Sequence, residues 1–244
     1  MRSNAEHISE HKKKYGQFFT SRPVAEFMAE WVAEKSPKRI LDPAVGEGIF
    51  LKTVHKMLPE SSMTAYEIDP VMAERFHEEC KFENTLYIED YMKSESTRQY
   101  DGIICNPPYH RFQEIPDRKQ IRQLFQKRYG INLNGFSNAS SYFLIKSIYE
   151  LAPGGRCAYI LPYEFLNTGY GKAVKRCLVK EEVLRQIIRF HSSVKVFEDV
   201  ITTCCILLLE KPVEPPDHSA AVSSENSCCA DKSVIFTEID SMNS

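Results

Sequence analysis

The sequence predicts an α/β fold whose mostly parallel sheet is covered by helices on both faces. Strand-like apolar runs alternate with helical patterns along most of the chain, and the runs are rich in Ile, Leu, Val, Cys and Tyr. Strands that are apolar on both sides are typical of parallel sheets between two helical layers. The last two runs before residue 212 are joined by a loop too short for a crossover helix, so the last strand is expected to be antiparallel.

Each element is predicted from its local pattern. Seven strand-like runs predict a seven-stranded sheet, at residues 39–45, 64–69, 85–90, 100–106, 156–162, 183–190 and 202–211. Helical patterns lie around residues 49–58, 70–80, 140–151 and 170–180. A further helix is expected after Ser21, because serine is a good N-cap and Pro23 follows in the first turn.

Composition and charge limit the class of protein. The chain has 244 residues, 43% hydrophobic and 26% charged, which is typical of a globular protein. Its formal net charge is -2, so a nucleic-acid partner requires a local basic surface or another domain. The chain has no signal-peptide core and no apolar run that could cross a membrane, so we expect a cytoplasmic protein with no membrane partner.

The eight cysteines do not indicate a metal site. They form no CxxC pair, and no set of His and Cys residues has the spacing of zinc ligands. Most lie in apolar runs, where a free cysteine behaves as a small hydrophobic residue. We therefore expect reduced, buried thiols, no metal, and an intracellular location.

A glycine-rich turn at residues 40–48 predicts a cofactor site. The strand ends at Asp42, and Gly46 and Gly48 allow a ligand to approach the backbone closely. The next strand ends at Glu67, where a Rossmann-like site places an acid on ribose hydroxyls. A carboxylate at Asp42 repels phosphates and favours cations, so S-adenosylmethionine fits better than a dinucleotide. The alternative is that Asp42 caps the following helix and Glu67 is a solvated strand end.

The third strand ends in Asp90 and Tyr91. A carboxylate at this position can accept a hydrogen bond from the amino group of the cofactor adenine, with Tyr91 and Ile68 against the faces of its ring. The alternative is that this acidic segment is only a turn.

The fourth strand ends in Asn106, Pro107, Pro108 and Tyr109. Two prolines stiffen the backbone and bring no N–H donor, and asparagine adds an uncharged oxygen. The Asn106 side-chain oxygen and the Pro107 carbonyl can therefore grip both hydrogens of one amino group, and Tyr109 offers an aromatic face. A base inside a duplex cannot reach such a site, so the target must be flipped out or unpaired. The alternative is a proline-rich turn at the end of a strand.

Together, these motifs resemble the gamma-class amino-methyltransferases, which include TaqI-type adenine enzymes and the modification subunits and fusions of restriction systems. The resemblance covers residues 12–211 and implies a Rossmann-like class I S-adenosylmethionine-dependent methyltransferase fold. It implies that Thr20, in the segment YGQFFTS, contacts the methionine end of the cofactor, and that Ala44 contributes to the DPAVGEG cofactor motif. Phe197 is implied as the second face against the flipped adenine.

The resemblance implies transfer of a methyl group from S-adenosylmethionine to the N6 amine of adenine in DNA, within a restriction-modification system. N-methylation of RNA, protein glutamine or cytosine N4 remains an alternative, because enzymes with those substrates share the NPPY motif. A domain that binds cofactor or nucleic acid without turnover is a further alternative. The GQFFT segment favours the DNA enzymes.

The domain organisation follows from the same comparison of motifs. We expect a cofactor-closing segment at 1–21, the catalytic domain at 22–211, a linker at 212–232 and the start of a missing target-recognition region at 233–244. DNA is then bound weakly by this chain alone, with a nuclease, specificity subunit or fused domain as a partner. The basic segment 110–130 is expected to contact phosphates, or to be an amphipathic helix that buries Ile121, Leu124 and Phe125.

Overall fold

The computed structural model describes most of the predicted catalytic domain. The described residues are 19–95, 99–109, 117–132, 138–169, 171–191, 194, 196–197, 203–214 and 233–240. Most of the predicted cofactor-closing segment and linker, and residues 110–116 of the predicted basic segment, therefore lie outside the described residues.

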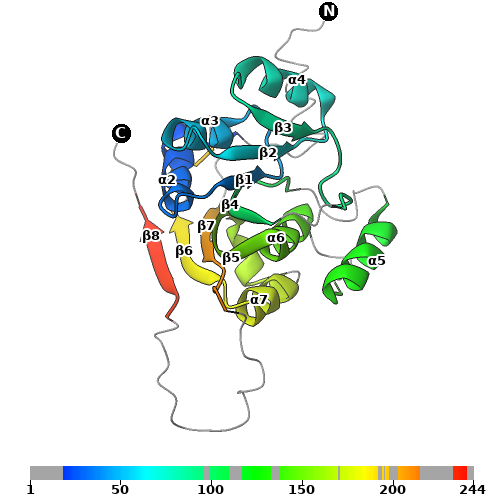
Figure 1. Ribbon diagram of the computed structural model, residues 1–244. Helices are drawn as coiled ribbons and strands as arrows, with labels where there is room; N and C mark the ends of the chain where they lie inside the picture. Colours follow the sequence, from blue (N-terminus) through cyan, green and yellow to red (C-terminus); the bar gives the residue numbers. More distant parts are fainter. Residues whose placement is uncertain are drawn as a thin grey trace, which may run out of the picture.

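One sheet with helices on both faces forms the described part of the chain (Figure 1). In spatial order its strands are β3 (Asn84–Tyr87), β2 (Ser62–Tyr66), β1 (Arg39–Asp42), β4 (Tyr100–Cys105), β5 (Leu151–Pro162), β7 (Cys204–Glu210), β6 (Leu184–Phe190) and β8 (Ile235–Ile239). Strand β7 is antiparallel to both of its neighbours, and all other pairs are parallel. The predicted mostly parallel α/β sheet with a late antiparallel strand is confirmed.

The sheet has eight strands, one more than the seven predicted. The additional strand, β8, comes from the candidate beyond the linker and pairs in parallel with β6, with Gln186 opposite Ile235 and Phe190 opposite Ile239. An edge strand exposes a row of unpaired backbone groups, and β8 pairs those of β6. Local patterns identify a strand but not its partner, so its place in the sheet was not predictable from them.

Helices cover the sheet in two layers, because alternate strand residues point to opposite faces. The helices are α2 (Arg22–Ala33), α3 (Ile49–Met57), α4 (Pro70–Glu79), α5 (Arg118–Tyr129), α6 (Ala139–Glu150) and α7 (Gly171–Lys180). Helices α2, α3 and α4 pack on the face that carries Ile104 and Leu208. Helices α5, α6 and α7 pack on the face that carries Ile103 and Leu207.

The N-terminal residues of α2 and α4 show which capping hydrogen bonds form. Ser21 is the N-cap of α2 and proline follows it, as predicted, but the Ser21 side chain makes no capping hydrogen bond. Its backbone N–H donates instead to the carbonyl of Val196, at 2.9 Å. Asp69 caps α4 by accepting from the backbone N–H of Val71, at 3.0 Å. The start of α2 is thus held by a tertiary contact.

The cysteines in the described part of the chain are free and buried, as expected. They are Cys80, Cys105, Cys157, Cys177, Cys204 and Cys205, while Cys228 and Cys229 lie outside the described residues. Burial raises the pKa of the Cys80 thiol to about 11. Within the described ranges, no cluster of His, Cys, Asp or Glu has a metal-binding arrangement. None of the described helices is long and apolar enough to span a membrane.

Candidate active site

Three of the predicted site residues, Asp42, Glu67 and Asn106, lie at the carboxyl ends of β1, β2 and β4. Strand β1 lies between the other two, with Leu41 opposite Thr64 on β2 and Ile103 on β4. The segments that follow these parallel strands therefore emerge at the same edge, where open α/β sheets bind ligands. The glycine turn follows β1 and the Asn106 segment follows β4, so the two segments leave adjacent strands.

The glycine turn has a left-handed backbone at two positions. Gly46 has a φ of 52° and Gly48 a φ of 80°, a region that side chains with a Cβ rarely adopt. A Cβ on Gly48 would lie 2.6 Å from the ring of Phe76, whereas a Cβ on Gly46 would meet nothing within 4 Å. Gly48 is thus required by packing, and Gly46 faces space that a ligand can enter.

Asp42 is completely buried at the end of β1. One carboxyl oxygen, Oδ1, accepts from the backbone N–H of Ala44 at 3.1 Å, and the other, Oδ2, has no hydrogen-bond partner among the described residues. Burial raises the Asp42 pKa to about 8. A buried oxygen without a partner is costly, so this carboxyl group is suited to a ligand that brings a donor or a positive charge. Gly48, with no side chain, is the N-cap of α3, so Asp42 is not its cap.

Asp42 is expected to make the protein less stable as pH rises. The folded protein keeps the Asp42 proton up to about pH 8. The unfolded chain loses it near the ordinary pKa of about 4. The folded state binds more protons between these values, so the free energy of unfolding falls with rising pH in this window. Urea denaturation at a series of pH values should show that the free energy of unfolding falls less steeply with pH in Asp42→Asn than in the wild type.

A matched control for that measurement is Asp101→Asn. A hydrogen bond from Arg39 lowers the Asp101 pKa, so its contribution is lost only at acid pH and its replacement leaves the slope near neutrality unchanged. Burial also raises the pKa of Glu67, so some slope persists in Asp42→Asn. Equal slopes for the wild type and Asp42→Asn would contradict the assignment.

Glu67 is buried, so the interpretation of it as a solvated strand end is wrong. Its two carboxyl oxygens accept from the backbone N–H groups of Asp69 and Gly46, each at 2.9 Å. The carboxylate therefore joins the end of β2 to the glycine turn. The next residue, Ile68, is 52% exposed and offers an apolar surface at the same edge.

The structure separates the roles predicted for Asp90 and Tyr91. The Asp90 carboxylate accepts from the backbone N–H of Met92 at 3.0 Å, and partial burial raises its pKa. Tyr91 instead lies in the core, where its hydroxyl donates to Glu150 at 2.7 Å. The Tyr91 ring is therefore not presented at the site edge, because Glu150, 59 positions along the chain, holds its hydroxyl inside.

Asn106 is held by hydrogen bonds at both ends of its side-chain amide. Its Oδ1 accepts from the Tyr109 hydroxyl at 2.8 Å, and its Nδ2 donates to Thr20 Oγ1 at 3.1 Å. The Tyr109 hydroxyl also lies 3.4 Å from the carbonyl of Ile160. Burial raises the Tyr109 pKa well above its ordinary value, so the hydroxyl keeps its proton and can donate. Of the two prolines between them, Pro107 is buried and Pro108 half-buried.

Thr20 and Phe197 close this corner of the site. The two residues form an isolated antiparallel bridge. The centres of the Phe197 and Tyr109 rings are 6.2 Å apart with an interplanar angle of 68°. The structure thus brings together the predicted residues Thr20, Asn106, Tyr109 and Phe197 from three separate segments.

Sequence reasoning missed the polar cluster beneath the site. Lys146 and Glu150 lie on α6, are buried, and have their side-chain charges 3.5 Å apart. Two opposite charges four positions apart within an apolar helix pattern were a signal that could have identified them. The hydroxyl of Ser147, on the same helix, forms a hydrogen bond with the hydroxyl of Tyr159 at 2.6 Å.

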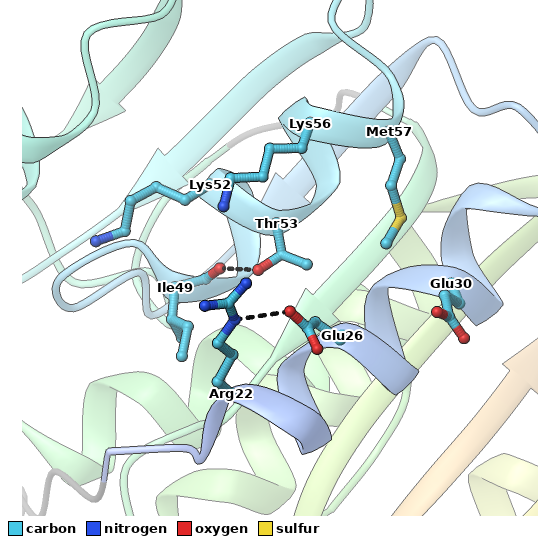
Figure 2. A pocket seen from close by; sticks show the side chains of 8 residues that line it. All are labelled: Arg22, Glu26, Glu30, Ile49, Lys52, Thr53, Lys56 and Met57. Atoms are coloured by element: carbon cyan, nitrogen blue, oxygen red, sulfur yellow. Dashed lines mark hydrogen bonds and ion pairs between the residues drawn. The ribbon is translucent and has the colours of Figure 1, made fainter. Parts of the chain in front are cut away.

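A groove of about 390 Å³ is lined by side chains of α2 and α3 (Figure 2). It is lined by Arg22, Glu26, Glu30, Ile49, Lys52, Thr53, Lys56 and Met57. An ion pair joins Arg22 to Glu26 at 2.8 Å, and Thr53 donates to the carbonyl of Ile49. The lining is mixed in charge and includes none of the predicted site residues.

Comparisons with known proteins identify relatives of this chain. The Type II methyltransferase M.AccI of Acinetobacter calcoaceticus is 43% identical over 197 residues, which are 80% of this chain and 36% of that protein. M.HincII of Haemophilus influenzae, also a Type II methyltransferase, is 30% identical over 195 residues, 79% of this chain and 37% of that protein. The chain thus spans little more than a third of the length of these relatives.

A solved structure from Listeria monocytogenes, described as a class I S-adenosylmethionine-dependent methyltransferase, has a TM-score of 0.68 and 20% identity. The match covers 91% of this chain and 65% of that one, and it establishes the class I fold. Residues 4–81 match the family described as N-6 DNA Methylase. Residues 51–197, more than half of the chain, match the family described as Eco57I restriction-modification methylase. The chain therefore belongs to the Eco57I restriction-modification methylase family.

Proposed function

We propose that this chain is the catalytic domain of an S-adenosylmethionine-dependent DNA methyltransferase that acts on the N6 amine of adenine. The observation that carries the proposal is the position of Asn106. Its amide lies at the sheet edge beside the glycine turn and is oriented by Tyr109 and Thr20. Family membership and the similarity to Type II methyltransferases support the same function.

The residues of the glycine turn fit S-adenosylmethionine. The unpaired Oδ2 of Asp42 suits a cationic ligand, and the open space beside Gly46 allows close approach. Glu67 is proposed to accept from the ribose hydroxyls, because each of its oxygens has a second lone pair. Ile68 and Asp90 are proposed to contact the adenine, through its ring face and its amino group. When bound, the cofactor supplies an electrophilic methyl carbon.

The Asn106 segment is proposed to hold the acceptor amine. The Asn106 oxygen, which the Tyr109 hydroxyl holds in place, is the proposed acceptor for one amine hydrogen. The Pro107 carbonyl is the proposed second acceptor. Holding both hydrogens directs the nitrogen lone pair at the methyl carbon, and catalysis then depends on positioning and charge stabilisation. Transfer forms an N–C bond, breaks a C–S bond and releases one amine proton.

The proposed acceptor is adenine in DNA, and a transfer assay tests it. With radiolabelled cofactor, we expect label in adenine-containing DNA and none in a duplex of guanine and cytosine alone. If label is found only in RNA, in a glutamine peptide or in cytosine, that molecule is the acceptor in place of adenine in DNA. Binding of S-adenosylhomocysteine without transfer to any acceptor would favour a domain that binds without turnover, and no binding by folded protein would reject the proposal.

The domain boundaries and partners belong to the same proposal. We propose a cofactor-closing segment at 1–21, a catalytic domain at 22–211 and a linker at 212–232, after which β8 (Ile235–Ile239) returns to the catalytic sheet beside β6. Because the relatives are much longer than this chain, sequence-specific DNA binding is assigned to a region beyond it. A nuclease or specificity subunit, or a fused domain, is the proposed partner in a restriction-modification system.

Helix α5 is the proposed contact for DNA phosphates. No acidic residue lies within this helix, and its exposed basic residues are Arg118, Lys119, Arg122 and Lys127, while Arg128 is paired with Glu95. Its apolar residues Ile121 and Phe125 are buried in the core, so the helix is amphipathic and docked. In a chain of net charge -2, this predominantly basic surface is the proposed local patch for DNA phosphates.

Neutralising α5 is expected to weaken DNA binding without sequence preference. The double change Lys119→Gln and Arg122→Gln should lower affinity at low salt, and should reduce the salt slope by about 0.9 for each lost phosphate contact. Fluorescence anisotropy over a salt series measures both. The control is Lys180→Gln. This residue ends α7 just before β6 begins, so it lies at the amino end of that strand. An unchanged slope in the double variant would remove α5 from the DNA surface.

A further inference from the structure

Helix α6 carries a fully buried lysine whose ammonium group contacts a single turn of the chain. Lys146 Nζ donates to the carbonyl of Tyr91 at 2.7 Å and to the carbonyl of Ser94 at 2.9 Å. It also donates to the Ser94 hydroxyl and lies 3.5 Å from Glu150. Burying a charge is costly, and a hydrophobic residue of similar size often stabilises a core as well as an ion pair does. This placement therefore calls for an explanation beyond stability.

The turn that Lys146 holds begins at Asp90. The backbone N–H groups of Lys93 and Ser94 donate to the Asp90 carbonyl at 2.9 and 3.1 Å, which makes residues 90–94 one helical turn. The Asp90 carboxylate accepts from Met92 N–H at the start of this turn. The ammonium group of Lys146 binds the carbonyls of Tyr91 and Ser94 within the same turn. The position of the Asp90 carboxylate thus depends on the lysine that binds the turn.

A second set of contacts ties the same turn to α6 and α5. The Tyr91 hydroxyl donates to Glu150 at 2.7 Å and lies 3.1 Å from Ser147 Oγ. Arg128 on α5 donates to the Ser94 carbonyl at 2.8 Å. Among these contacts, only the ammonium of Lys146 binds both the Tyr91 and Ser94 carbonyls. It is the central support of the turn.

We infer that Lys146 is a positioning residue that sets the Asp90 carboxylate against the amino group of the cofactor adenine. The inference rests on the proposed function, in which Asp90 accepts that hydrogen bond. Lys146 itself is buried beneath the turn and does not reach the ligand. Its effect on cofactor recognition passes entirely through the backbone of residues 91–94.

The test compares two ligands, S-adenosylhomocysteine and S-inosylhomocysteine, in which an oxygen replaces the 6-amino group. The wild type is expected to prefer the first by about tenfold, because the second brings an oxygen towards the Asp90 carboxylate. Lys146→Met is expected to reduce this preference to about twofold. Both ligands bind only the folded protein. A purely structural loss of stability therefore leaves the ratio of the two dissociation constants unchanged. Calorimetry on folded protein measures the two dissociation constants.

Three further variants make the outcome decisive. Asp90→Asn should lose the preference, and the double variant with Lys146→Met should lose no more than Asp90→Asn does alone. Glu150→Gln disturbs the same cluster but leaves the ammonium contacts to the turn, so it should keep the wild-type preference. Lys146→Gln retains one donor for the turn and should show an intermediate ratio, which provides a second variant if Lys146→Met does not fold.

Two outcomes separate the inference from the proposed function. If Asp90→Asn loses the preference while both Lys146 variants keep it, Lys146 is only structural and the inference is overturned. If Asp90→Asn itself keeps the wild-type preference, Asp90 does not contact the amino group, and that part of the proposed function fails.

Discussion

Asn106→Ala is expected to lower the rate of methyl transfer by about a thousandfold, the scale of losing a preorganised group at the reacting centre. The Asn106 oxygen is the proposed acceptor for one amine hydrogen, and Tyr109 and Thr20 hold it in place. The affinity for S-adenosylhomocysteine should fall by no more than about fivefold, because on the proposed cofactor side Thr20 loses one hydrogen bond. Single-turnover kinetics and calorimetry measure the two effects.

The matched control is Asn84→Ala. Asn84 is the first residue of β3, at the amino end of that strand, whereas Asn106 follows the carboxyl end of β4. The Asn84 amide donates to the carbonyl of Phe82 at 2.8 Å. This change removes an asparagine of similar exposure and should leave the transfer rate unchanged. A large loss of cofactor affinity in Asn106→Ala, with transfer at saturating cofactor preserved, would place Asn106 in the cofactor site instead.

Gly48→Ala is expected to destabilise the protein by about 3 kcal/mol, the sum of left-handed backbone strain and overpacking. The φ of 80° disfavours any side chain, and the new Cβ would lie 2.6 Å from the Phe76 ring and 2.7 Å from Cys80 Sγ. Both neighbours are buried, so neither can move freely. The midpoint of urea unfolding should fall clearly in the absence of any ligand.

Gly46→Ala is the matched control, with the opposite profile. Its φ of 52° costs about 1 kcal/mol, and its Cβ meets nothing within 4 Å. The protein should therefore stay nearly as stable, but S-adenosylhomocysteine should bind at least about tenfold more weakly, because the methyl group occupies the space proposed for the ligand. Equal affinity in the wild type and Gly46→Ala would show that the cofactor does not approach this turn.

The sheet edge was predictable because its signals are local. Two prolines after a strand end its pairing, and a glycine turn after a strand marks a close approach of backbone, whatever the rest of the fold. The parallel order of the strands then brings Asp42, Glu67 and Asn106 to one edge. The pattern also predicts most strands and helices, because apolar residues follow the periods of 2 and 3.6.

Other features depend on partners that local patterns do not identify. Tyr91 follows a strand end in the expected place, but Glu150 on α6 holds its hydroxyl in the core. Ser21 begins α2 as predicted, but the contact at that point is a backbone bond to Val196. The strand near Ile235 was recognised, but its pairing with β6 was not.

By itself, the sequence determined the backbone of the site: where strands stop, where φ is positive, and where carbonyls stand without neighbouring donors. These are properties of proline and glycine and of their immediate neighbours. Only the tertiary structure decided which side chains are buried and which are paired. Burial and hydrogen bonding join segments far apart in the chain, as with Thr20 and Asn106, which are 86 positions apart. The unpaired oxygen of Asp42 and the lysine beneath the Asp90 turn arise in this way.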